Sequence, residues 1–285
     1  MMEGKKKNYF TGTLLTLLPL VSAFLVQAVV STVGAVFYGI YLAVNGLGLT
    51  EAIYETEGYS HFLTVVTVLS ELMMLLCAGI WYANMHKTEA GIKASIKPFR
   101  ILWALMLGIG IQGVTSLLLN LIYAVYPENW LETYNELMDS MLDTSSVFMV
   151  ISVAILAPIA EELFFRGLML KYALKTFPVT AAVIIQAVGF GILHGNAVQF
   201  TYAALIGLVL GFVAVRYDSV WPGVLIHIGV NSTAEILTVT GIEISLPVMV
   251  IAGLLFCIAA IFLCVKKDKP ENAANAAVIS EKSEE

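Results

Sequence analysis

Long apolar runs dominate this sequence, and they constrain the fold more than any other feature. A transmembrane helix needs about 20 largely apolar residues. Only 13% of the 285 residues are charged, against about a quarter in soluble domains. We therefore expect an all-α membrane helix bundle with about eight transmembrane helices. The expected spans are roughly Leu14–Val44, Phe62–Met85, Phe99–Tyr126, Val147–Phe177, Val179–His194, Ala197–Val215, Val220–Thr240 and Leu246–Val265, of which the fifth is short for a complete span.

The charged residues between these spans alternate in sign along the chain. The basic connections contain Lys5–Lys7, Lys87, Lys93, Lys97, Arg100, Lys171, Lys175, Arg216, Lys266, Lys267 and Lys269. The acidic connections contain Glu51, Glu55, Glu57, Glu128, Glu132, Glu136, Asp139, Asp143 and Glu243. Because basic residues favour the cytoplasmic side, the alternation predicts an integral protein of the plasma membrane with both termini in the cytoplasm. The net charge of −6 lies largely in loops and in the tail, so we expect no nucleic acid partner.

The fourth expected span contains three ionisable residues, Glu161, Glu162 and Arg166. Each costs at least about 2.5–3.5 kcal/mol inside a membrane, so such residues usually mark function. Glu162 and Arg166 are four residues apart, which favours an ion pair on one helix face. Glu161 projects about 100° away from Glu162, and we expect it to be the free carboxylate. Pro158 removes a backbone donor just before this pair and is expected to loosen the helix. The alternative is a triplet that only fixes helix packing.

Polar residues also occur at helical spacing in two later spans. His194 ends the fifth span, four residues after Phe190. His227 and Asn231 are four residues apart and therefore share a face of the seventh span. Glu235 lies four residues further along and extends this polar stripe. Polar residues of this kind can also hold membrane helices together through hydrogen bonds, which is the alternative interpretation.

Residue counting predicts the depth of these side chains. Glu161 lies 16 residues before Phe177, and His194 lies 16 residues after Pro178. If both helices are straight, the two side chains lie at a similar depth. His227 follows closely on the expected cytoplasmic start of its span, so this counting places it nearer the cytoplasm than His194. A tilted helix, or a broken or interfacial helix after Arg166, would close this gap, and the counting leaves the two alternatives open.

Three motifs occur in an order that resembles a known family. They are E-E-x-x-x-R at Glu161, Glu162 and Arg166, F-x-x-x-H at Phe190 and His194, and H-x-x-x-N at His227 and Asn231. Over about residues 145–240 the chain resembles the CPBP family, the CAAX-prenyl-protease-like and bacteriocin-processing intramembrane proteases that are also called ABI proteins. The resemblance implies an eight-helix bundle and endopeptidase activity on membrane-associated substrates. It also implies an active site in a cavity reached from the cytosol.

The chain accordingly divides into four expected parts. Residues 1–145 form N-terminal membrane helices and an amphipathic outer loop, and residues 146–240 form the CPBP-like catalytic helices. Residues 241–266 form the last transmembrane helix, and residues 267–285 form a polar, disordered cytoplasmic tail. The stretch Pro127–Thr144 has apolar residues at helical spacing, so we expect an amphipathic helix on the outer surface.

Peptide hydrolysis requires an activated water, donors for the developing oxyanion and a proton for the leaving amine. We expect Glu161, with His194, to activate the water as a general base. His227 and Asn231 would donate hydrogen bonds to the oxyanion. The ion pair of the fourth span would hold these catalytic groups in place.

A zinc ion is an open alternative to this metal-free chemistry. Catalytic zinc sites commonly use three protein ligands and a water, and Glu161, His194 and His227 are the candidate ligands. The sequence has no H-E-x-x-H motif and nothing in it requires a metal. We therefore assign no cofactor and favour the metal-free mechanism.

Two other functions compete with the protease. A transporter or proton relay would use Glu71 of the second span together with the stripe from His227 to Glu235. A non-catalytic immunity or scaffold protein could share the fold. For the protease, the expected partners are the lipid bilayer and a membrane-associated protein or peptide. Prenylated CAAX peptides, bacteriocin leader peptides and other membrane-protein segments all fit the resemblance.

Overall fold

The computed structural model describes residues 8–48, 56–86, 98–142 and 146–267, and these residues form helices with no β-strand among them. The helices are α1 (Tyr9–Val44), α3 (Thr56–His86), α4 (Pro98–Val125), α5 (Glu128–Leu142), α6 (Val147–Ile151), α7 (Ala157–Glu162), α8 (Leu170–Thr176), α9 (Val179–Leu193), α10 (Ala197–Tyr217), α11 (Trp221–Thr240) and α12 (Leu246–Lys267), with π-helical stretches η1 (Ser152–Leu156) and η2 (Leu163–Met169). The predicted tail, apart from Lys267, and several loop charges lie outside the described residues; these charges are Lys5–Lys7, Glu51, Glu55, Lys87, Lys93, Lys97 and Asp143.

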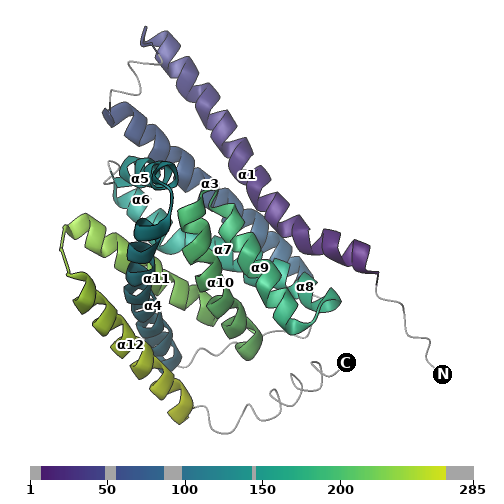
Figure 1. Cartoon of the computed structure of the whole chain (residues 1–285). Coiled ribbons are helices and arrows are strands. Elements are labelled where there is room, and N and C mark those ends of the chain that lie inside the picture. Colours follow the sequence, from purple (N-terminus) through teal and green to yellow (C-terminus); the bar gives the residue numbers. More distant parts are fainter. Residues whose placement is uncertain (1–7, 49–55, 87–97, 143–145, 268–285) are drawn as a thin grey trace.

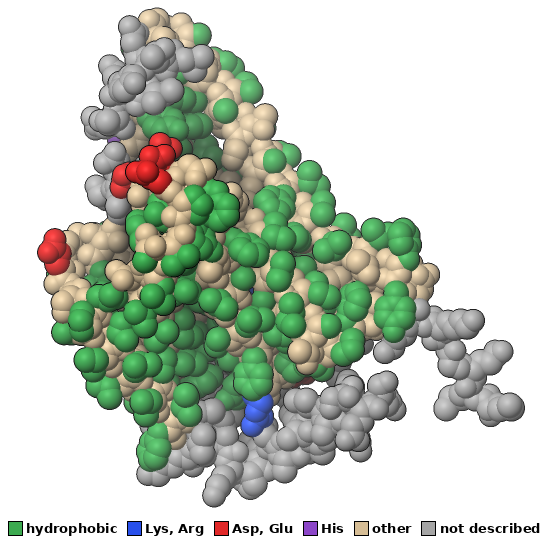
Figure 2. All heavy atoms as spheres, viewed as in Figure 1, with side chains coloured by type: hydrophobic (Ala, Val, Ile, Leu, Met, Phe, Trp, Pro, Cys, Tyr) green, Lys and Arg blue, Asp and Glu red, His purple; other side chains and the backbone are tan. Residues whose placement is uncertain are grey.

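The length and composition of the helices confirm an all-α membrane bundle. Within the described part of the chain, six helical segments are long and apolar enough to cross a membrane, and α9 and the described part of α12 are shorter apolar helices. Figure 2 shows an outer surface covered largely by hydrophobic side chains, with acidic groups near one end of the molecule and basic groups near the other. Such a surface suits lipid rather than water. The predicted amphipathic outer loop is the helix α5, which packs its Tyr134 against Ile122 and Val198.

The fourth expected span is one continuous apolar segment, but it is not a regular α-helix. It passes through α6, η1, α7, η2 and α8, with wide π-helical turns on both sides of α7. Pro158 lies in the first turn of α7. Proline has no N–H to donate to the preceding turn, and the helix widens directly before it. The expected loosening is therefore confirmed, and the fourth span is not one regular α-helix. Wide turns of this kind are frequent at functional sites.

The main apolar core lies where the α7–η2 segment meets α3, α9 and α10. Its fully buried members include Met74 and Ala78 of α3, Phe164 and Phe165 of η2, and Phe190 of α9. Figure 1 shows α1 and α3 running side by side along one edge. The helices α3 and α11 contact α7, and α9 and α10 contact η2. This packing surrounds the two glutamates of α7 with protein rather than with lipid.

The helix α4 packs against α11 and α12 at glycine positions. A Cβ atom on Gly108 would lie 2.2 Å from the carbonyl oxygen of Ile226 and 2.8 Å from the Cα of Gly229. A Cβ atom on Gly113 would similarly lie 2.8 Å from the Cα of Gly253 in α12. Small residues let membrane helices approach until their backbones touch. The position of α11, which carries His227, is therefore fixed by direct backbone contact with α4.

Candidate active site

Glu162 lies at the centre of a buried charged cluster. Its Oε1 atom is 2.8 Å from an NH1 nitrogen of Arg166 and 3.1 Å from Nδ1 of His227. Glu162 and Arg166 have no exposed side-chain surface. The ion pair predicted from the spacing of these two residues is thus present, and it extends to a histidine of α11. Breaking a buried pair of this kind by removing one partner usually costs about 3–5 kcal/mol.

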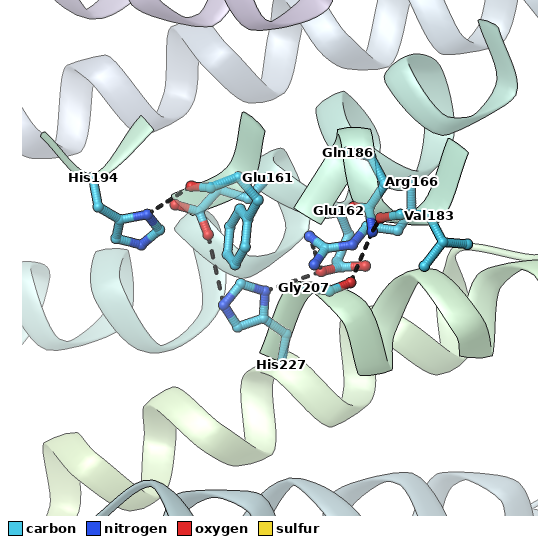
Figure 3. Close-up of polar contacts among 9 residues, drawn as sticks. Glu161, Glu162, Arg166, Val183, Gln186, His194, Gly207 and His227 are labelled. Carbon is cyan, nitrogen blue, oxygen red and sulfur yellow. Dashed lines mark hydrogen bonds and ion pairs between the residues drawn. The ribbon is translucent and has the colours of Figure 1, made fainter. Parts of the chain in front are cut away.

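The neighbouring carboxylate, Glu161, points toward the other nitrogen of the same imidazole. Its Oε2 atom lies 3.6 Å from Nε2 of His227, and 13% of its side chain is exposed. This distance is longer than a hydrogen bond. His227 therefore lies between the two glutamates, facing Glu162 through Nδ1 and Glu161 through Nε2 (Figure 3).

His194 follows the last residue of α9 and has a defined tautomer in its neutral form. Its Nδ1 atom lies 2.9 Å from the carbonyl oxygen of Phe190. A carbonyl oxygen can only accept, so Nδ1 must carry the proton and Nε2 is left with a free lone pair. Figure 3 shows His194 and Glu161 pointing toward one another. His194 can thus accept a proton or bind a water through Nε2.

The ring of Phe190 lies among the charged and aromatic groups of the site. Its centroid is 5.0 Å from that of His194 and 5.6 Å from that of His227, and both pairs are edge-on. The guanidinium carbon of Arg166 lies 4.4 Å from the same centroid, within the range of a cation–π contact. One aromatic side chain therefore holds both histidines and the arginine at fixed positions.

Asn231 is held by the widened turn before Pro158. Its Nδ2 atom donates to the carbonyl oxygen of Val153 at 2.9 Å. In the π-helical turn the N–H of Ala157 bonds to Ser152, and the next residue is Pro158, which has no N–H. The carbonyl oxygen of Val153 therefore has no backbone donor and accepts the hydrogen bond from Asn231. This hydrogen bond links α11 to η1. One N–H of the amide is used in this way, and the second remains available for another acceptor.

The structure places the rings of both His194 and His227 against the ring of Phe190, so the difference in depth that residue counting left open does not separate them. Two features explain this arrangement. First, α9 has only 15 residues, so His194 lies at the end of a helix that is short for a full span. Second, α11 is held at its start by Val220, a core residue with 1% exposure, and along its length by the contact of Gly229 with Gly108 of α4. Counting from an expected membrane boundary therefore does not fix the depth of His227.

Two buried polar side chains were given no role in the protease site that the sequence predicts. Gln186 lies one helical turn before Phe190, is fully buried, and donates to the carbonyl oxygen of Gly207 at 2.8 Å. Glu71 of α3 is 9% exposed. The available signal for Gln186 was its spacing of four residues from Phe190, which continues the stripe that ends at His194.

The arrangement does not favour a metal centre. Among the residues that the structure describes, no three histidine, cysteine, aspartate or glutamate side chains are grouped as ligands for a metal ion. Glu161, His194 and His227 surround a common region, but their geometry is not that of a preformed zinc site. We therefore derive no catalytic step through a metal.

The candidate active site lies within a segment that matches a known protein family. Residues 143–233 match the family model described as type II CAAX prenyl endopeptidase Rce1-like. The matched segment contains both glutamates, Arg166, His194, His227 and Asn231. This match confirms the family resemblance predicted from the three motifs. No curated protein matches this chain, and no solved structure matches it.

Proposed function

We propose that this membrane protein, which carries a CAAX prenyl endopeptidase segment, hydrolyses peptide bonds of membrane-associated or prenylated CAAX-type substrates with a water activated by Glu161. The observation that carries the proposal is the position of His227 between two glutamates of α7. Its Nε2 atom faces Glu161 at 3.6 Å, while its Nδ1 atom is fixed by Glu162 at 3.1 Å. The family match makes peptide hydrolysis the reaction that suits this arrangement best.

The spacing of Glu161 and His227 suits a shared water molecule. A water can lie about 2.8 Å from each of two polar atoms that are separated by 3.6 Å. In the proposed reaction Glu161 takes a proton from this water, and the water oxygen attacks the scissile carbonyl carbon. His194 assists through the lone pair of Nε2. The proton on Glu161 then passes to the nitrogen of the leaving amine.

Asn231 and His227 remain the proposed groups for the developing oxyanion. Because Nδ1 of His227 donates to Glu162, its Nε2 atom can donate to the oxyanion only as an imidazolium, which is the form that the proposal requires. They lie one turn apart on α11, and Asn231 has one N–H that Val153 does not use. Loss of a single oxyanion donor costs about 2.7–4 kcal/mol in a well-studied protease. Glu162 and Arg166 do not touch the water in this scheme, and they hold His227 in position.

The charges of the described residues support a membrane orientation. Lys171, Lys175 and Arg216 lie at the ends of α8 and α10, whereas the acidic helix α5 lies at the opposite end of the bundle (Figure 1). We assign the basic end to the cytoplasm because of the positive-inside rule. We also assign the protein to the plasma membrane.

The proposal is tested with purified protein and a panel of prenylated and unprenylated peptides. Glu161→Gln keeps the shape of the side chain but removes the base, so we expect the cleavage rate to fall by at least about 100-fold with the thermal unfolding midpoint unchanged. Glu235→Gln is the matched control because Glu235 is a half-buried carboxylate on α11 that has no part in the proposed site. Turnover that survives in Glu161→Gln would refute the role of Glu161.

A further inference from the structure

Glu71 is a buried carboxyl group that the proposed mechanism does not use. It lies in the middle of α3, outside the segment that matches the family model. Glu71 is only 9% exposed, and its Oε2 atom has no hydrogen-bond partner among the described residues. A buried carboxyl oxygen without a partner is rare and calls for an explanation.

The helix α3 presents this carboxyl group toward α7. Glu71, Met74 and Ala78 are spaced by three and four residues and so share one helix face. Met74 and Ala78 are fully buried in the core that contains Ala160, next to Glu161. Further along the same face, Tyr82 lies against Gly167, where an added Cβ atom would be 2.7 Å from the tyrosine ring.

The register of this contact places Glu71 beside the start of α7, little more than one helical turn before Glu161. The helix α3 and the α7–η2 segment run in the same direction (Figure 1). Residues of α3 that lie three helical turns before Tyr82 are therefore beside residues that lie about three turns before Gly167, at the start of α7. Glu71 lies within electrostatic range of Glu161. Neighbouring carboxyl groups in a buried site repel one another when both are ionised.

No other acidic or basic group competes for Glu71 on the described helices that pack around it. The helix α1 contains tyrosines but no acidic, basic or histidine residue, and α6 and η1 contain no ionisable side chain. From the α7–η2 segment, Glu161, Glu162 and Arg166 face this region, and Arg166 is paired with Glu162 at 2.8 Å. The acidic residues of α5, among them Glu132 and Glu136, are exposed. Glu161 is thus the partner that the structure offers to Glu71.

We propose that Glu71 is a positioning residue for the protease reaction: it keeps its proton and donates a hydrogen bond to Glu161 through one water. This hydrogen bond turns the remaining lone pairs of Glu161 toward the nucleophilic water. The water gives one proton to Glu161 and its oxygen to the acyl carbon, and the C–N bond breaks as that proton moves to the leaving amine. The proton of Glu71 is not consumed. This inference rests on the proposed function of Glu161.

A pair of substitutions separates this role from simple packing. Glu71→Leu fills a similar volume but removes the donor, whereas Glu71→Gln keeps an N–H donor at the same place. We expect Glu71→Leu to lower kcat by about 10- to 100-fold, the size of a hydrogen bond to a charged group, with KM unchanged. We expect Glu71→Gln to restore kcat to within about threefold of wild type. Ser70→Ala, a buried neighbour on α3, is the control and keeps wild-type kcat.

Infrared spectroscopy provides a readout that does not need turnover. At neutral pH we expect wild-type protein to show the C=O stretch of a protonated carboxyl group. This band should disappear in Glu71→Gln and Glu71→Leu and remain in Ser70→Ala and Glu161→Gln. A wild-type spectrum without the band overturns the inference, and so does a band that persists in Glu71→Gln. Wild-type kcat in Glu71→Leu also overturns it. An inactive wild-type protein that shows the expected bands refutes the protease proposal while leaving the protonated Glu71 in place.

Discussion

Gly223 offers a sharp test of how the buried charge cluster is held together. This glycine lies in the first turn of α11. A Cβ atom at this position would lie 2.6 Å from Oε2 of Glu162, which is 0.8 Å short of the 3.4 Å at which ordinary contact begins. The carboxylate cannot turn away freely, because its other oxygen is held by Arg166 at 2.8 Å and by His227 at 3.1 Å. Gly223→Ala should therefore push Glu162 out of its ion pair.

The expected loss of stability follows from two opposing terms. Ala in place of Gly inside a helix normally stabilises by about 0.5–1 kcal/mol. Weakening a hydrogen bond to a charged group costs about 1.5–3 kcal/mol, and breaking a buried ion pair costs about 3–5 kcal/mol. The free energy of unfolding of Gly223→Ala should therefore fall by about 1–4 kcal/mol.

Denaturant unfolding of purified protein in detergent micelles measures this change. The matched control is Gly79→Ala in α3, where an added Cβ atom meets nothing within 4 Å. The control should be as stable as the wild type or slightly more stable. Peptide cleavage by Gly223→Ala should also fall, since His227 loses its fixed partner. If Gly223→Ala matches Gly79→Ala in both stability and cleavage, the steric argument about Glu162 is wrong.

Three further substitutions test the packing and pairing of the bundle. Arg166→Met leaves the Glu162 carboxylate buried without its cation, and unfolding in detergent should show a loss of about 3–5 kcal/mol; an unchanged stability would contradict the ion pair. Gly108→Ala places a Cβ atom 2.2 Å from a backbone carbonyl of α11, so its unfolding free energy should fall by at least about 1 kcal/mol, and a neutral effect would exclude the tight helix contact. Trp81→Phe removes the 3.1 Å hydrogen bond from the indole to Tyr172, and a double-mutant cycle with Tyr172→Phe should give a coupling of about 0.5–1.5 kcal/mol, whereas additive effects would argue against the bond.

Much of the fold was predictable, because the length of the apolar runs and the alternating sign of the charges between them both reflect a lipid environment. The long apolar runs predicted the helices, and the spacing of apolar residues from Pro127 to Thr144 predicted α5. The π-helical turns on both sides of α7 were not predictable from periodicity. They depend on which backbone carbonyls find another hydrogen-bond donor in place of the N–H that Pro158 lacks. One such partner, Asn231, comes from a helix more than 70 residues away in the chain.

The site residues were predictable as residue types, but their contacts were not. Helical spacing was sufficient for the pair of Glu162 and Arg166, because both residues lie on one segment. The position of His227 between both glutamates depends on the rotation and depth of α11, which no local pattern encodes. The neighbours of Glu71 were likewise not predictable, because a carboxylate in an apolar run indicates burial but not which residue lies beside it.

The close approach of α4 and α11 has a consequence for exchanging segments between this protein and others that match the same family model. Residues 143–233 contain the whole proposed catalytic set, yet Gly229 of α11 is seated on Gly108, which lies outside that stretch. A chimera that transplants only residues 143–233 needs a recipient with no side chain at the position opposite Gly229. In a recipient with a larger residue there, α11 would be displaced sideways and would carry its imidazole away from the carboxylates. Transfer of residues 143–233 into another protein therefore depends on a glycine at the position of Gly108, in a helix that supplies no residue to the proposed site.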